Sequence, residues 1–128
     1  MTRLIEAAEA SAEVRAVYDD IKAVRGVADV NNFWEALAVH PPTLARTWES
    51  LKQVMAPGAL DPLVKEMLYL AASAAAGCTY CVASHTAAAR AKGMTDAMHG
   101  EVLAVLGMAA ETNRLAEALR VPVDPAFG

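Results

Sequence analysis

The stretch of sequence that decides the fold runs over residues 61–85 and reads DPLVKEMLYLAASAAAGCTYCVASH. It opens with Asp61-Pro62, an N-cap residue followed by a proline at the first helical position, which is a typical helix start. That helix should end just before Gly77, because glycine readily adopts the left-handed conformation at which helices commonly stop. A second helix is expected from Cys78 to Lys92. The stretch therefore predicts two consecutive helices that fold back on each other as a hairpin around Gly77.

The remaining segments also show helical patterns. Apolar residues recur at intervals of three and four residues, and proline, glycine or polar residues separate the segments. His40-Pro41-Pro42 ends one segment, since the residue before a proline is displaced from the α region. We find no strand pattern and expect an all-α bundle of about six to seven helices. Besides the hairpin, the expected helices lie at residues 11–24, 32–39, 44–55, 95–106 and 109–119, with a kink at Gly107 between the last two.

Length and charge restrict the class of protein. The 128 residues correspond to a single domain, expected to span residues 1–128, and no apolar run is long enough to cross a bilayer. A net charge of −4 without a basic run argues against nucleic acid as a partner, and the N-terminus lacks the layout of a signal peptide. We therefore expect a cytoplasmic protein that binds neither nucleic acid nor membranes.

The apolar content is high for a domain of this size. Hydrophobic residues make up 55% of the chain, which is more than one small core can hide, and much of the excess is alanine. We expect the surplus to be buried between the subunits of a homo-oligomer. Three aromatic residues, Phe33, Trp34 and Trp48, are candidates for that interface, and the two tryptophans fit a core position equally well.

Both cysteines of the chain and one of its three histidines occur between Cys78 and His85. In a helix, the spacings i, i+3 and i+7 place Cys78, Cys81 and His85 along one stripe. Two thiols one turn apart can close a disulfide, and an imidazole one turn further can accept the proton of Cys81. The helix start after Gly77 favours the thiolate form, because unpaired backbone N–H groups lie there. In a reducing compartment such a pair is more often catalytic, redox-active or metal-binding than a structural staple.

The first helix of the hairpin carries a lone glutamate, Glu66, within a largely apolar run. Glu66 lies about 11 residues before the turn and His85 about 8 after it, so at about 1.5 Å per residue their heights differ by roughly 4–5 Å. Two side chains, with or without a water between them, can span that difference. Tyr69 and Ser73 follow on the Glu66 face, so a polar line is expected beside Cys81 and His85.

On these residues the chain resembles a known family. The pattern of Glu66, eleven intervening residues, Cys78-x-x-Cys81, three residues and His85 is similar to that of the AhpD-like alkylhydroperoxidases of the carboxymuconolactone decarboxylase superfamily. The resemblance extends upstream to Val39-His40-Pro41 and covers about residues 31–93. It implies an AhpD-like helical bundle, assembled as a homo-oligomer such as a trimer or hexamer, with no metal or other cofactor.

The resemblance also implies an activity and roles for four residues. The activity is that of a thiol-dependent peroxidase or disulfide oxidoreductase, which takes a peroxide substrate and a dithiol reductant of lipoyl, thioredoxin-like or small-thiol type. Cys81 is then the thiol that reacts with peroxide, Cys78 is the proton donor and resolving thiol, and His85 and Glu66 form a proton relay. AhpD proper has a histidine where this chain has Tyr80. The decarboxylases of the superfamily lack the cysteine pair, so the resemblance does not imply lactone decarboxylation.

Other interpretations of the same residues stay open. The cysteines can be buried as small apolar side chains. Cys78, Cys81, His85 and Glu66 can formally bind zinc, although one helical stripe spreads three ligands over about 10 Å. Glu66 can also be solvated or paired with Lys65. The chain can therefore be a non-redox or a redox-sensing member of the superfamily that has no peroxidase turnover.

The other polar residues have structural as well as functional interpretations. Tyr69 and Ser73 are candidates for supporting the site, and Tyr80 either packs or lines an access path. His40, directly before a proline, is interpreted as a structural residue at a helix end. His99 precedes a glycine in a polar segment and is interpreted as a surface residue.

Overall fold

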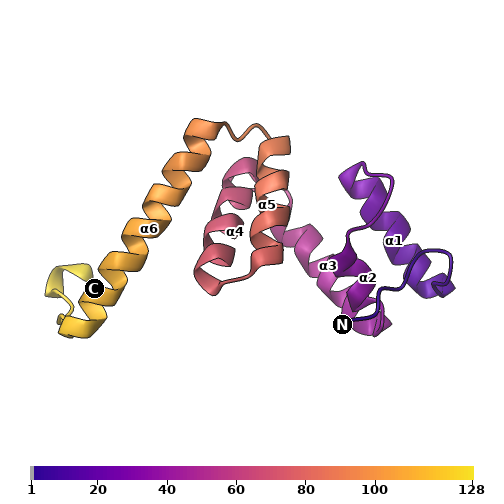
Figure 1. Cartoon of the computed structure of the whole chain (residues 1–128), viewed down its shortest axis with the longest axis horizontal. Coiled ribbons are helices and arrows are strands. Elements are labelled where there is room, and N and C mark those ends of the chain that lie inside the picture. Colours follow the sequence, from indigo (N-terminus) through magenta and orange to yellow (C-terminus); the bar gives the residue numbers. More distant parts are fainter. Residues whose placement is uncertain (1) are drawn as a thin grey trace. The chain divides into compact units, whose positions relative to one another are not determined.

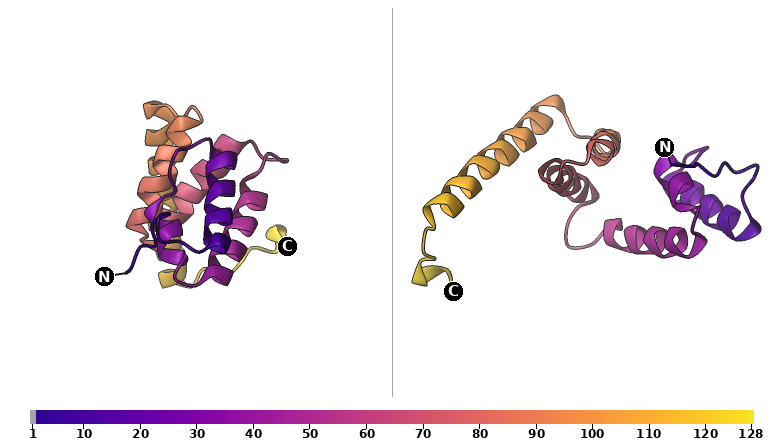
Figure 2. Two further views of the ribbon diagram at one scale, coloured as in Figure 1. Left: turned by 90° about the vertical axis from the view of Figure 1, so that its right-hand side faces the viewer. Right: turned by 60° about the horizontal axis from the view of Figure 1, so that its bottom comes forward.

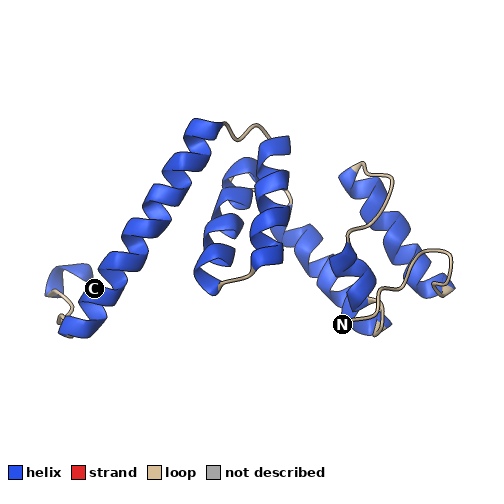
Figure 3. Cartoon of the chain, in the orientation of Figure 1, coloured by secondary structure: helices blue, strands red, loops and turns tan. Residues whose placement is uncertain are grey.

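The computed structural model describes residues 2–128, and its regular structure is helical (Figures 1 and 3). No strand is present within this range, so the prediction of an all-α fold is confirmed. None of the helices in the described part of the chain is long and apolar enough to cross a membrane. The elements are α1 (Ala12–Arg25), α2 (Asn32–Leu37), α3 (Pro41–Met55), α4 (Pro62–Ala76), α5 (Thr79–Ala91), α6 (Asp96–Leu119) and the short 3₁₀ helix η1 (Pro125–Phe127).

Side-chain oxygens cap the starts of three helices. The Asp61 carboxylate accepts a hydrogen bond from the backbone N–H of Leu63 at 2.7 Å, and Pro62 occupies the first position of α4. The hydroxyls of Ser11 and Thr95 likewise accept from backbone N–H groups in the first turns of α1 and α6. Each cap satisfies a backbone donor that the helix itself leaves unpaired. The helix starts predicted at these positions are confirmed.

Two helices differ from the expectation. α3 begins at Pro41 rather than at residue 44, because a proline whose fixed φ suits the first helical turn can start a helix as well as end one. The kink expected at Gly107 is wrong, since α6 runs without a break from Asp96 to Leu119. Glycine inside a helix weakens it by about 1 kcal/mol but breaks no backbone hydrogen bond, so flanking helix-forming residues such as Met108 carry the helix through.

The chain divides into two compact units, and the first ends at Ala56. This unit contains α1, α2 and α3 and has a core of large side chains. Trp34 and Trp48 are 1% and 4% exposed and pack edge to face, with ring centroids 5.5 Å apart. The indole N–H of Trp48 donates to the Asp20 carboxylate at 2.7 Å. The two tryptophans are therefore core residues of this unit, whereas Phe33 is 40% exposed.

The second unit runs from Pro57 to Gly128 and contains α4, α5 and α6. α4 and α5 lie side by side as the predicted hairpin, joined by the turn at Gly77 (Figures 1 and 2). The fully buried apolar core of this unit is small and consists of Leu70, Ala89 and Met94. The single domain and the homo-oligomer expected from the sequence stay predictions.

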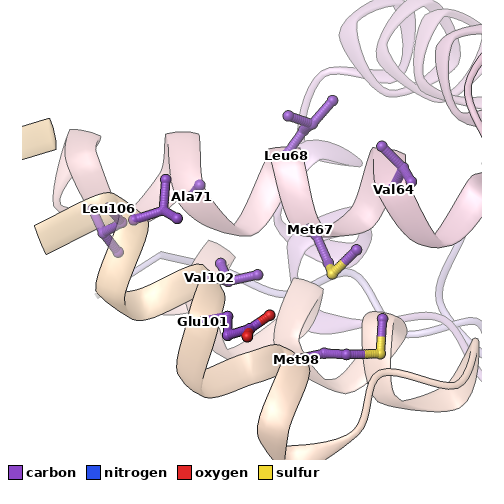
Figure 4. A pocket seen from close by; sticks show the side chains of 9 residues that line it. Val64, Met67, Leu68, Ala71, Met98, Glu101, Val102 and Leu106 are labelled. Carbon is purple, nitrogen blue, oxygen red and sulfur yellow. The ribbon is translucent and has the colours of Figure 1, made fainter. Parts of the chain in front are cut away.

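An open apolar cleft of about 380 Å³ lies between α4 and α6 (Figure 4). It is set on the side of α4 that carries Val64 and Leu68, and Glu101 of α6 supplies a carboxylate. At about 100° per residue this side of α4 faces away from Glu66. The cleft is therefore separate from the face of the hairpin that carries the motif. Its lining residues are Val64, Met67, Leu68, Ala71, Met98, Glu101, Val102, Val105 and Leu106.

Two glycines should respond in opposite ways to the same substitution. Gly77 has a φ of 74°, so Gly77→Ala should lower the free energy of unfolding by about 1–2 kcal/mol, although no atom lies within 4 Å of the added Cβ. Gly107 lies in an exposed helical turn with open space around it, so Gly107→Ala should raise that free energy by about 1 kcal/mol. Urea unfolding followed by circular dichroism measures both changes. A destabilising Gly107→Ala would contradict the continuous α6.

Candidate active site

The turn between α4 and α5 places the cysteines at the start of a helix. Gly77 adopts the left-handed conformation, and its N–H donates to the Ala74 carbonyl at 3.2 Å. The N–H of the next residue, Cys78, donates to the Ser73 carbonyl at 3.0 Å. These two bonds satisfy carbonyls at the end of α4 and reverse the chain direction within two residues. Cys78 therefore becomes the N-cap of α5.

Cys78 and Cys81 form a disulfide, with an S–S distance of 2.06 Å and Cα atoms 5.3 Å apart. Both residues are half-buried, and Tyr80 between them is 43% exposed. The Sγ atom of Cys78 also accepts a hydrogen bond from the backbone N–H of Cys81 at 3.2 Å. The intramolecular pairing predicted from the spacing is therefore present.

Glu66 and His85 meet across the hairpin, directly and without an intervening water. The Nδ1 atom of His85 lies 2.8 Å from Oε2 of Glu66. The side chain of His85 is 13% exposed and that of Glu66 is 8% exposed, so the interaction lies largely inside the unit. Of the alternatives that the sequence left open for Glu66, the solvated surface position is wrong, because this carboxylate is buried.

The three supporting candidates have different positions. The Tyr69 ring stacks on the His85 imidazole, with centroids 3.7 Å apart and planes inclined by 20°. This contact restricts the rotation of the imidazole. Ser73 is buried beneath the turn, where its carbonyl accepts from Cys78. Tyr80 lies at the exposed start of α5. Of the predicted polar line of Glu66, Tyr69 and Ser73, the first two contact His85, whereas Ser73 contacts the turn through its backbone carbonyl.

Lys92 is a further member of the site that the sequence reasoning missed. Its Nζ atom lies 3.2 Å from Oε1 of Glu66, and its side chain is 42% exposed. Lys92 follows His85 by seven residues, which is two helical turns along the same stripe as Cys78 and Cys81. Extending that stripe by one more step reaches the position of Lys92 but does not show its contact with Glu66.

Burial and two partners shift the pKa of the Glu66 carboxyl in opposite directions. Burial raises the pKa of Glu66, whereas the hydrogen bonds and positive charges of His85 and Lys92 lower it, and together they bring it below the usual 4.5. Glu66 is therefore a carboxylate at neutral pH. A carboxylate can only accept hydrogen bonds, so Nδ1 of His85 must be the donor. In the neutral imidazole this leaves Nε2 with a free lone pair that can accept a proton.

The other two histidines lie outside this site. His40 is the N-cap of α3, and its Nδ1 atom lies 2.7 Å from the Thr43 hydroxyl, which fits the structural interpretation of this residue. His99 is half-buried rather than fully exposed, and its Nδ1 atom lies 3.2 Å from a guanidinium nitrogen of Arg90. The surface interpretation of His99 is therefore only partly right.

A helical hairpin with a disulfide at its turn and a buried carboxylate–imidazole pair below it is the arrangement that the sequence motif predicted. A model of the carboxymuconolactone decarboxylase family matches residues 41–124. The chain belongs to this family.

Two relatives define the relationship more closely. The chain is similar to alkyl hydroperoxide reductase AhpD of Solibacter usitatus, with 35% identity over 107 residues that cover 81% of this chain and 59% of that protein. It is also similar to a crystal structure of the alkylhydroperoxidase AhpD core from Rhodospirillum rubrum, with 58% identity and a TM-score of 0.96. That match covers 99% of this chain and 96% of the solved chain. The AhpD-like resemblance and fold are thereby confirmed.

The contribution of Glu66 to stability should depend on pH. The lowered pKa means that its contribution is complete above about pH 4.5 and is lost as the pH falls through the still lower folded value. At neutral pH, Glu66→Gln should lower the free energy of unfolding by about 1–3 kcal/mol, because a buried charge-assisted hydrogen bond is lost. As the pH falls below about 4.5, the free energies of unfolding of the wild type and of Glu66→Gln should converge. Urea unfolding over a pH series tests this, and a constant difference down to acid pH would contradict it.

Proposed function

We propose that this chain is a thiol-dependent peroxidase that reduces hydroperoxides through Cys81 and Cys78 and is recycled by an external dithiol. The observation that carries the proposal is the disulfide at the start of α5, one helical turn before an imidazole that a buried carboxylate holds. The names of both relatives, an alkyl hydroperoxide reductase and an alkylhydroperoxidase core, support this chemistry.

In the first step, Cys81 is the nucleophile. Nε2 of His85 accepts the thiol proton, and the thiolate attacks the terminal oxygen of the hydroperoxide. The O–O bond breaks, and the sulfur takes one oxygen to become a sulfenic acid while it loses two electrons. The leaving alkoxide takes the proton back from His85, so the products are Cys81 sulfenic acid and an alcohol. Glu66 stabilises the imidazolium that exists between the two proton transfers.

In the second step, the resolving thiol is Cys78. Its sulfur attacks the sulfenic sulfur of Cys81, water leaves, and the resulting S–S bond is the disulfide of the structure. An external dithiol then attacks the disulfide through a mixed disulfide with Cys78, and its second thiol releases the protein. Two electrons and two protons pass from the dithiol to the cysteines, which restores both thiols.

The surface around the disulfide favours an uncharged reductant. From Met67 to Ala89 the sequence has no Asp, Glu, Lys or Arg, so the tip of the hairpin offers no partner for an ion pair. Its exposed side chains are small or neutral, and they include Ala76, Thr79 and Tyr80. Among the reductants considered, we therefore expect the uncharged dithiol dihydrolipoamide to react better than the charged monothiol glutathione.

A peroxidase assay with a panel of reductants tests the function. Wild-type protein should consume an organic hydroperoxide with dihydrolipoamide or thioredoxin, and Cys81→Ser should reduce turnover at least a hundredfold, because the attacking sulfur is gone. Mass spectrometry of the oxidised protein should show the loss of two hydrogens, which a dithiol restores. If the disulfide forms and is reduced but no reductant supports turnover, the protein is a redox sensor and not a peroxidase.

The assignment of the two cysteines has its own test. With hydroperoxide and a sulfenic-acid trap, Cys78→Ser should accumulate trapped sulfenate on Cys81, because the resolving thiol is absent. Cys81→Ser should accumulate none on Cys78. The competing assignment, in which the first cysteine attacks as in thioredoxin-like sites, predicts the opposite pattern. Peptide mapping of the trapped adduct distinguishes the two.

A further inference from the structure

The half-exposed side chain of Lys92 lies between the buried Glu66 carboxylate and solvent. Its ammonium contacts Oε1 of Glu66, while the other oxygen of the same carboxylate contacts His85. The backbone position of Lys92 is fixed, because it is the C-cap of α5 and its N–H donates to the carbonyls of Ala88 and Ala89 at 3.2 and 3.1 Å. A cation at this end of a helix also interacts favourably with the helix dipole. Lys92 is thus held where its charge meets a buried carboxylate.

The ionisation of Glu66 depends on what surrounds it. A carboxylate that is 8% exposed favours its neutral form unless a cation or hydrogen-bond donors compensate for the lost solvation. From α5 the facing groups are His85 and Lys92. On α4, Tyr69 stacks on the imidazole, and Lys65 precedes Glu66 in the sequence. α6 brings Glu101 to the cleft on the other side of α4, away from Glu66. Lys92 is therefore a cation in direct contact with Glu66.

The protonation state of Glu66 decides which nitrogen of His85 is available. An ionised Glu66 accepts from Nδ1, so Nε2 of the neutral ring is free to accept the Cys81 proton. A protonated Glu66 can donate to Nδ1 instead, which moves the ring proton to Nε2 and removes the base. The two tautomers differ only in proton positions, but one of them cannot deprotonate Cys81.

We propose that Lys92 is a positioning residue of the redox site, which holds Glu66 in the ionised form and thereby sets the tautomer of His85. Lys92 touches neither the sulfurs nor the peroxide in this scheme, and it acts through Glu66 and His85. The inference rests on the proposed function, since it assigns His85 as the base for Cys81. It adds a fourth member, at the C-terminal end of α5, to the relay of Glu66, His85 and Cys81.

The pH dependence of Cys81 alkylation tests this role without any peroxide. In the Cys78→Ser background, the rate of iodoacetamide alkylation reports the thiolate fraction of Cys81. Lys92→Met should move the midpoint of this profile upward by about one pH unit, which lowers the rate roughly tenfold on the acid side. Lys92→Arg should restore the wild-type profile. Arg90→Met is the matched control, because it removes a cation from the same helix end, where Arg90 pairs with Asp96.

A double-mutant cycle separates action through Glu66 from a direct effect on the sulfur. In the Glu66→Gln background no carboxylate is left to hold, so adding Lys92→Met should change the alkylation rate by less than about twofold. An equal slowing in both backgrounds would show that Lys92 acts on Cys81 directly and would overturn the proposal. So would a Lys92→Met profile that coincides with that of wild type. Circular dichroism verifies folding, and Lys92→Gln replaces Lys92→Met if the latter loses helix.

The same experiment distinguishes this proposal from the peroxidase assignment. If the wild-type protein shows no turnover with any reductant, the proposed function fails, while the alkylation profiles still report the effect of Lys92 on Cys81. If turnover is present and Lys92→Met leaves both the alkylation profile and the pH profile of kcat unchanged, the function stands and the role of Lys92 is refuted.

Discussion

The hydrogen bond between Glu66 and His85 is the constraint on which the second unit depends. A buried carboxylate is costly unless partners compensate for its lost solvation, and these partners come from a different helix at the opposite side of a turn. α4 and α5 can therefore not slide or rotate independently without leaving a charge unpaired. The turn at Gly77 and the caps at both helix starts serve this register, because they fix where each helix begins and ends.

The two units stabilise themselves in different ways. The first buries large aromatic and aliphatic side chains, among them Trp34, Tyr18 and Leu44. The second has few fully buried apolar residues and combines them with the polar pair, small alanines and the disulfide. Small side chains let helices approach closely and leave room for the His85 imidazole, on which the exposed Tyr69 ring stacks. The chemistry is thus placed in the unit whose packing is dominated by small side chains.

Much of this arrangement follows from local sequence signals. Asp61-Pro62 and Gly77 predicted the bounds of α4, and the spacing of Cys78, Cys81 and His85 predicted their common stripe. Glu66 was predicted from a height estimate and the family motif, since a single glutamate in an apolar helix has no local signature. The continuity of α6 at Gly107 depends on neighbours that outweigh one weak residue, which propensity alone does not resolve.

Lys92 was missed for a physical reason. Lysines at helix ends are common because the helix dipole favours them, so its position gave no sign of a role in a site. Only the packing of α5 against α4 shows that a long flexible side chain reaches a carboxylate 26 residues away in the sequence. Contacts of this kind depend on tertiary structure, whereas caps and stripes depend on the segment itself.

The position of Cys78 as N-cap of α5 links the oxidation state of a sulfur atom to the integrity of a helix end. Its Sγ atom accepts from the backbone N–H of Cys81 while the disulfide is closed. A reduced, ionised Cys78 would accept the same hydrogen bond more strongly, because the acceptor then carries a full negative charge. The covalent tether and the electrostatic cap can therefore replace each other, so the first turn of α5 remains anchored in both redox states. Electron transfer at this turn then requires little rearrangement of the backbone.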